Sequence, residues 1–304
     1  MAEAEQNTSQ QSQTQQPATA GASLPGYFAL LGSSWHVYIK RFWTLIGISF
    51  VPLLAYLAVI LASVIFGLIG GLASALTGTL TMIVFGLVFL VGIIAIVVVA
   101  IWSQVALLTA IDRAEETLGI KESFRRAWPK VNGYFWVGVL AGLVVVGGLF
   151  LLLVPGIIFY VWFVFSSMVV VFENEKGMNA LLKSRELVRG CWWGIFGRLI
   201  FFAVILIGIS IILEMLHLGV LANIVNFLLT PLSVAYVYLL YRSAKAARGE
   251  FAFSPSKSSR NIFTAIAVFG IIALVALLMA MAIGISDLSQ SGVIDKLMNG
   301  ASGI

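Results

Sequence analysis

Very few side chains in this sequence have the types and spacing that chemistry requires. The chain contains one cysteine, Cys191, and two histidines, His36 and His217, which are too few for an intrachain disulfide or for a cysteine or histidine metal site. It also has no GxxxxGK[ST] loop, no HExxH pair and no GxSxG turn, the patterns that mark nucleotide binding, zinc hydrolysis and serine nucleophiles. We therefore expect a protein that is not an enzyme and that has no cofactor and no metal.

Polar residues that stand alone in apolar sequence are the remaining candidates for a site. Gln104 is one of them, and Asn223 and Asn226 precede Pro231, which we expect to kink its helix. If these side chains and Arg198 lined one cavity, they would favour a carrier. If they lay on separate faces, they would favour hydrogen bonding between helices. Both readings stay open at the level of sequence.

The composition shows what kind of elements must position these residues. Of 304 residues, 61% are hydrophobic and 10% are charged, whereas about 25% of residues are charged in soluble domains. The mean hydropathy is +1.05. A soluble core of this length cannot bury so much apolar surface, so the composition predicts an integral membrane protein. We expect no nucleic-acid partner despite the net charge of +5.

Seven segments are long and apolar enough, or nearly so, to cross a bilayer, which requires about 20 residues of helix. They are residues 43–66, 80–109, 135–153, 157–172, 193–213, 219–241 and 262–285. Pro155-Gly156 marks a tight reversal before the fourth segment. The sequence therefore predicts an all-α polytopic membrane bundle of about seven spans, made of a six-span core and one further span.

The flanking segments complete the predicted domain organisation. Residues 1–25 are rich in Gln, Ser, Thr and Ala, a composition typical of a disordered tail. Residues 26–241 form the six-span domain, 242–261 a basic cytoplasmic loop, 262–285 the seventh span and 286–304 an external C-terminal tail.

The basic residues predict the orientation of the spans. If the N-terminus is cytoplasmic, 17 of the 18 Lys and Arg residues fall on the inner side and only Lys296 falls outside. Inner loops of membrane proteins carry such an excess of positive charge. We therefore expect a multi-pass protein of the cytoplasmic membrane with its N-terminus inside, and with its C-terminus outside if the seventh segment spans.

The sequence also contains a threefold internal repeat, aligned on three tryptophans. The aligned residues are Trp43, Trp136 and Trp193, with Leu31, Phe124 and Leu181 twelve positions earlier and Ser34, Ala127 and Ser184 nine positions earlier. Each copy is a basic amphipathic segment, then a short aromatic stretch around the aligned tryptophan, which we call the seam, and then a span. The fold class therefore includes three repeats of an amphipathic interfacial helix and a transmembrane hairpin.

The basic segments predict helices that lie at the membrane surface near 27–41, 121–132 and 177–190. We expect Gly133 and Gly190 to end their helices in the left-handed conformation and Pro129 to shorten the second helix. The alternative is that these segments are ordinary basic turns.

Aromatic and basic residues at the seams are the candidate lipid anchors. They are Trp43, Trp136, Trp192, Trp193, Arg189 and Arg198. Tryptophan favours the membrane interface because its ring is apolar and its N–H is polar. Arg198 lies about 7.5 Å deeper along its helix than Trp193, so its long side chain can reach back to the headgroups, and Glu173 or Glu175 could also pair with it. We expect Arg198 to be an anchor rather than part of a substrate site.

Small residues predict where helices approach one another closely. Gly67 and Gly71 have GxxxG spacing, as do Gly138 and Gly142, and this spacing permits close backbone approach between membrane helices. We expect helix contacts at these two pairs.

Residues 122–201 carry a pattern that resembles a known family. Leu153-Val154-Pro155-Gly156 opens a span, Glu173 follows it, and Ala180, Ser184, Leu187, Gly190 and Trp193 then fit A-x-x-x-S-x-x-L-x-x-G-x-x-W. This pattern resembles the glycerophosphoryl diester phosphodiesterase membrane-domain family of prokaryotic multi-pass proteins. The resemblance implies a membrane fold but no hydrolase activity, because the chain has no room for the soluble phosphodiesterase barrel.

Two functions fit these observations. The first is a non-catalytic membrane protein that binds or organises lipids or partner proteins. Its expected partners are membrane lipids, with anionic headgroups on the cytoplasmic side, and a second copy or another membrane protein. The alternative is a carrier or lipid-handling transporter with a small polar cavity around the kinked sixth span.

Overall fold

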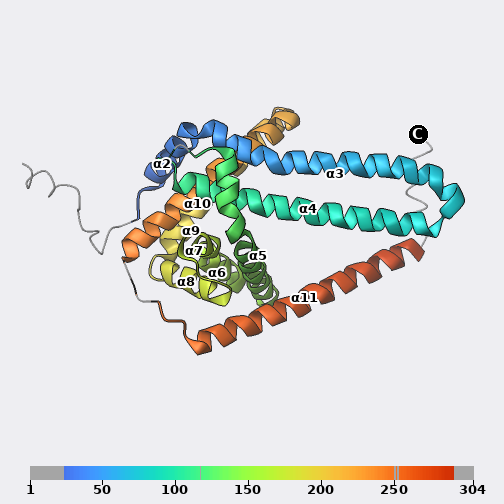
Figure 1. Cartoon of the computed structure of the whole chain (residues 1–304). Coiled ribbons are helices and arrows are strands. Elements are labelled where there is room, and N and C mark those ends of the chain that lie inside the picture. Colours follow the sequence, from blue (N-terminus) through green and yellow to red (C-terminus); the bar gives the residue numbers. More distant parts are fainter. Residues whose placement is uncertain (1–23, 117, 250, 252, 291–304) are drawn as a thin grey trace, which may run out of the picture.

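The computed structural model describes residues 24–290 apart from residues 117, 250 and 252, and within that part the chain forms helices and turns but no strand. The helices are α2 Tyr27–Lys40, α3 Phe42–Thr77, α4 Thr79–Asp112, α5 Ile120–Leu151, α6 Leu153–Phe163, α7 Ser166–Glu173, α8 Met178–Val188, α9 Trp192–Met215, α10 Gly219–Arg248 and α11 Lys257–Gln290 (Figure 1). The predicted all-α fold class is confirmed. Most of the predicted N-terminal and C-terminal tails, with Lys296, lies outside the described residues.

Seven spans are confirmed by length and composition in the described part of the chain. They are Phe42–Leu68, Ile83–Asp112, Ile120–Leu151, Leu153–Glu173, Trp192–Met215, Gly219–Arg248 and Lys257–Gly284. Each is one helix, apart from the fourth span, which contains two consecutive helices, and its apolar stretch is long enough to cross the hydrocarbon layer. The chain is therefore a multi-pass integral membrane protein.

The packed core lies at one end of these spans. On α4, Ser103 and residues 105–111 are buried, whereas the described side chains before Trp102 are exposed or half-buried. On α3, Leu45, Ile46 and Ile48 are buried, and exposed leucines begin at Leu53. We call this end the basic end, because most of the described Lys and Arg residues lie there: at the end of α2, just after α4, in the first third of α5, on and beside α8, at the end of α10 and at the start of α11.

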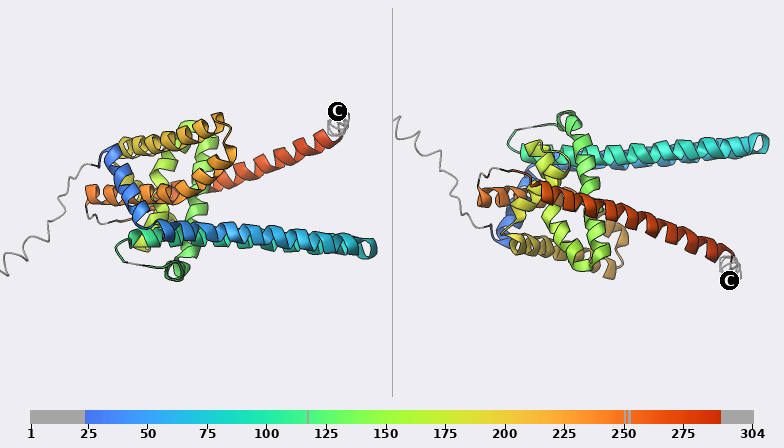
Figure 2. Two further views of the ribbon diagram at one scale, coloured as in Figure 1. Left: turned by 90° about the horizontal axis from the view of Figure 1, so that it is seen from above. Right: turned by 90° about the horizontal axis from the view of Figure 1, so that it is seen from below.

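The α3–α4 hairpin and α11 extend away from the basic end. In Figure 1 they run toward the right of the view, and in both views of Figure 2 they diverge from each other. Their exposed side chains are mostly Leu, Ile, Val and Phe. Such a surface suits lipid rather than water, because a soluble monomer rarely exposes a large continuous apolar face.

Burial follows the predicted register of the repeat. Ser34, Ala127 and Ser184, which lie nine positions before the aligned tryptophans, each have an exposed fraction of 0%. The aligned tryptophans are all exposed instead. Equivalent positions therefore have equivalent environments in the three copies.

The second repeat differs from its prediction. Pro129 and Gly133 lie inside α5, which continues from Ile120 to Leu151 without a left-handed turn. The helix continues through Pro129 because tertiary contacts hold both sides of it: Ala127 is fully buried and Lys130 donates to the carbonyl of Val171 at 2.6 Å. The expected helix end at Gly133 and the shortening at Pro129 were therefore wrong.

The small size of Gly133 serves close packing instead. A Cβ atom at Gly133 would lie 3.1 Å from Cγ1 of Val170 on α7. Gly190, in contrast, has φ +89 after α8, as expected for a glycine that ends a helix.

The fourth span is also different from its prediction, because it consists of two helices. α6 begins at Leu153 after Leu152, which has an extended backbone. The helix is interrupted between Phe163, where α6 ends, and Ser166, where α7 begins. Ser184 on α8 supports this break, since its Oγ donates to the carbonyl of Trp162 at 2.7 Å and accepts from the N–H of Phe165 at 3.2 Å. A contact from a distant helix therefore decides where the span is interrupted.

The predicted basic loop 242–261 is shorter than expected. α10 continues to Arg248 and α11 begins at Lys257. The extension of α10 places Lys245 and Arg248 in its last turn. Basic residues are good helix formers, and cations near a helix C-terminus are favourable.

Candidate functional site

Arg198, in the second turn of α9, has an exposed fraction of 8%. Its guanidinium donates to the carbonyl of Pro25 at 2.6 and 3.0 Å, to that of Leu24 at 3.1 Å and to that of Gly194 at 2.7 Å. It also lies 4.9 Å from the ring centre of Tyr27. Arg198 therefore fastens the chain just before α2 onto α9.

Two glycines make room for this contact. A Cβ atom at Gly194 would lie 3.0 Å from Cδ1 of Leu24, and one at Gly197 would lie 2.9 Å from the hydroxyl oxygen of Tyr27. The segment Gly194 to Arg198 is thus shaped to accept residues 24–27. Nearby backbone carbonyls take the donors of Arg198, whereas Glu173 and Glu175 pair with lysines instead. The role of Arg198 as a lipid anchor stays a prediction.

Glu173 is occupied by other partners at the end of α7. Its side chain has an exposed fraction of 10%, and it pairs with Lys183 of α8 at 2.7 Å and with Lys245 of α10 at 3.0 Å. The hydroxyl of Tyr241 donates to the same carboxylate. Burial alone would lower the pKa of Lys183, but its hydrogen bonds and charge attraction with Glu173 and Glu175 together outweigh that effect and raise the pKa above the ordinary value. This cluster joins α7, α8 and α10.

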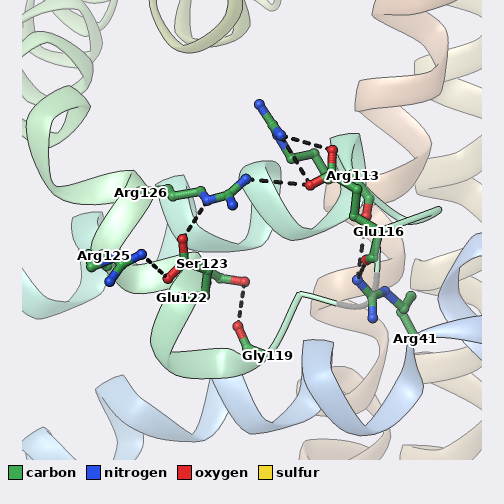
Figure 3. Close-up of polar contacts among 8 residues, drawn as sticks. All are labelled: Arg41, Arg113, Glu116, Gly119, Glu122, Ser123, Arg125 and Arg126. Atoms are coloured by element: carbon green, nitrogen blue, oxygen red, sulfur yellow. Dashed lines mark hydrogen bonds and ion pairs between the residues drawn. The ribbon is translucent and has the colours of Figure 1, made fainter.

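A second polar cluster lies where α3, α4 and α5 meet (Figure 3). Glu116 pairs with Arg113 at 2.9 Å and with Arg126 at 3.4 Å, and its backbone carbonyl accepts from Arg41. Glu122 pairs with Arg126 at 2.6 Å and with Arg125 at 2.7 Å. Four arginines surround two carboxylates, so the cluster keeps an excess of positive charge.

The other predicted lipid anchors differ in how far their side chains are exposed. Trp43, Trp136 and Trp193 have exposed fractions of 83%, 56% and 77%. Trp192 is half-buried and stacks on Phe196 with 4.9 Å between ring centres, and its N–H is buried with no hydrogen-bond partner among the described residues. The side chain of Arg189 has an exposed fraction of 70%.

The structure does not bring Arg198 and the predicted polar-cavity residues together. Asn223 is exposed and donates to the carbonyl of Gly219 at 3.1 Å, whereas Asn226 accepts from the hydroxyl of Ser210 at 3.0 Å. Ser210 lies twelve residues beyond Arg198 on α9, which is about 18 Å along the helix. Gln104 is half-buried on a different helix, α4. Asn223 and Asn226 thus bond to their own helix and to its neighbour.

Sequence reasoning missed Trp102, which stands outside the three repeat copies. Its indole N–H donates to the carbonyl of Phe124 at 2.8 Å, and its ring packs edge-on against Phe124 and Trp128 with 5.1 and 4.8 Å between centres. No spacing signal could identify it, because its partners lie more than twenty residues further along the chain.

The site at the basic end consists of cations and aromatic rings. In the described part of the chain, no group of three His, Cys, Asp or Glu side chains gathers as a metal ion would require. The resemblance of residues 122–201 to the glycerophosphoryl diester phosphodiesterase membrane-domain family stays a prediction. A scan against protein-family models, a search of curated proteins and a search of solved structures each found no match to this chain.

Proposed function

We propose that this chain is a non-catalytic protein of the cytoplasmic membrane that binds anionic lipids at its basic end and thereby organises lipids or partner proteins. The observation that carries the proposal is the repeated placement of exposed tryptophans near exposed cations where the spans meet the basic end. Trp43 follows Lys40 by three residues, Trp136 lines one hollow together with the exposed Lys176, and Trp193 follows Arg189 by four residues.

The physical argument concerns where such side chains are stable. Exposed indole rings favour the layer between hydrocarbon and water. Each Lys or Arg close to an anionic membrane surface adds about 1 kcal/mol of attraction. Exposed tryptophans and cations occur together at three places on the basic end, and this combination favours binding to anionic headgroups.

The excess of Lys and Arg at the basic end supports a cytoplasmic position for that end. With seven spans, the C-terminus then lies on the opposite side. The carrier alternative has less support, because Arg198, Asn223 and Asn226 have separate hydrogen-bond partners.

Native mass spectrometry tests the proposal. The protein is placed in nanodiscs that contain equal parts of phosphatidylglycerol and phosphatidylcholine, and then released. We expect retained lipid to be enriched in phosphatidylglycerol, and the enrichment to fall in a variant with Lys40→Gln, Lys176→Gln and Arg189→Gln, which are all exposed.

The control variant is Glu214→Gln, an exposed change at the far end of α9, which leaves the enrichment unchanged. Equal retention of the two lipids by the unaltered protein would contradict the proposal. Retention of one small solute in place of lipid would favour the carrier.

A further inference from the structure

The first half of α5 crosses α4 (Figure 1). A groove follows one face of α5 at this crossing. Lys121, Phe124, Trp128 and Phe135 line it from α5. These positions share a face because side chains three, four and seven residues apart lie on the same side of a helix. From Lys121 to Phe135 the groove extends about 21 Å along the helix.

The groove has two lobes that meet at Trp128. The first lobe has a volume of about 830 Å³ and is bounded by Trp102, Phe124 and Trp128. The second has a volume of about 440 Å³ and continues past Trp128 to Val98, Ile101 and Phe135. The indole of Trp128, with an exposed fraction of 56%, therefore forms a ridge between two apolar lobes.

The aromatic wall is fixed before any ligand arrives. The hydrogen bond from Trp102 to the carbonyl of Phe124 sets the orientation of its indole, and both Phe124 and Trp128 pack against that ring. A wall held in this way loses little conformational entropy on binding, which favours affinity.

The end of the groove at Lys121 is positive. The charged side chains at and near this end are Lys121, Arg125, Arg126 and Arg113, against Glu122 and Glu116. Lys121 is exposed and forms no ion pair with the described residues. α5 also begins here at Ile120, after Gly119, which offers no side-chain cap, so the first N–H groups of the helix add to the attraction for an anion.

The polarity therefore changes along the groove, from cations at Lys121 and Arg125 to apolar side chains at Val98 and Phe135. The groove also lies beside Trp102, where α4 passes from exposed to buried. We propose that the groove binds one anionic phospholipid, with its phosphate at Lys121 and Arg125 and its two acyl chains in the lobes on either side of Trp128. This inference rests on the proposed function and assigns it a defined site.

The first test compares lipid retention in charge variants of the whole protein. In nanodiscs of equal parts phosphatidylglycerol and phosphatidylcholine, the unaltered protein retains one phosphatidylglycerol molecule after release. Lys121→Gln with Arg125→Gln lowers the binding constant of this molecule by about twenty-five-fold, since each cation contributes about a factor of five. Both side chains are exposed, so the fold tolerates the change.

The matched controls are Lys257→Gln and Trp35→Ala, an exposed cation and an exposed tryptophan outside the groove. Both retain the single lipid. If the Lys121→Gln, Arg125→Gln variant retains the single phosphatidylglycerol molecule as well as the controls do, the proposal that the groove binds this lipid is overturned. This holds even where a general preference for phosphatidylglycerol persists. Absence of any such preference in the unaltered protein overturns the proposed function and the groove together.

The second test locates the acyl chains without any substitution. Phosphatidylglycerol with a photoreactive acyl chain is added to the unaltered protein, and the labelled peptides are identified. Label on residues 98–102 and 128–135 supports the site. Label confined to α3 and α11, or a copurifying protein segment that crosslinks to Trp128 in place of lipid, overturns it.

Discussion

Arg198 shows how an arginine near a membrane surface can serve the interior of the protein. Its planar group carries five donors in a fixed fork, so it can bond several carbonyls at once, whereas lysine offers a single flexible ammonium. Here it bonds the carbonyls of Leu24, Pro25 and Gly194. Sequence reasoning identified the residue but not these partners, because bonds to backbone carbonyls leave no trace in residue types.

Replacement of Arg198 by Met should release the segment before α2. Three carbonyls on half-buried residues lose the donors of Arg198, and an unsatisfied polar group costs about 1–3 kcal/mol where it is buried. We expect a lower thermal unfolding temperature in detergent and faster proteolysis before Tyr27. Arg189→Met, at a side chain with an exposed fraction of 70%, is the control. Equal stability of the two variants would contradict the role assigned to Arg198.

The ion pair of Lys183 with Glu173 should appear as a pH dependence. The pKa of Lys183 is raised in the folded protein, so its stabilising effect is complete below the unfolded value of about 10.4 and is lost as the pH rises through the folded value. We therefore expect the unfolding temperature to fall above about pH 10.4 more steeply in the unaltered protein than in Glu173→Gln. Parallel curves would show that the pair adds no stability.

At the scale of helices, the seven spans were predictable because long apolar runs leave few alternatives. The interruption of the fourth span and the continuity of α5 were not predictable. Both depend on tertiary contacts, from Ser184 to the α6–α7 break and from α7 to Gly133. Local propensity favoured a break at Pro129, and packing outweighed it.

The close helix contact also lies at glycines other than those predicted. A Cβ atom at Gly147 of α5 would lie 2.6 Å from the carbonyl oxygen of Ile266 on α11, and one at Gly270 would overlap the carbonyl of Leu143. Gly138 and Gly142 have nothing within 4 Å of such an atom. GxxxG spacing within one helix does not reveal which face meets a neighbour, so the predicted contact at this pair was wrong.

Gly147→Ala and Gly270→Ala should therefore push α11 away from α5. Overpacking of this kind costs about 1–3 kcal/mol, and we expect lower unfolding temperatures in detergent for both variants. Gly138→Ala is the matched control and should be neutral or slightly stabilising, because alanine favours a helix over glycine. A loss in Gly138→Ala as large as in Gly147→Ala would contradict this account of the contact.

At the scale of the whole molecule, the core is concentrated at the basic end, and the α3–α4 hairpin and α11 extend from it with exposed apolar sides (Figure 2). This division follows from the solvent, because a lipid-facing helix needs no protein cover for its apolar side chains. The sequence predicted the order of the three units and the seventh span. It could not predict that residues 24–27 pack on α9, since that contact joins segments about 170 residues apart.

Cysteine accessibility in intact cells tests the central claim, that the basic end faces the cytoplasm and the spans cross the membrane. In a Cys191→Ser background, single cysteines replace Leu216 at the α9–α10 turn, Ser302 near the C-terminus and Ser254 at the basic end. The account predicts that a membrane-impermeant thiol reagent labels Leu216→Cys and Ser302→Cys from outside, and labels Ser254→Cys only after the cells are opened. Labelling of Ser254→Cys in intact cells, with protection of the other two, would contradict it.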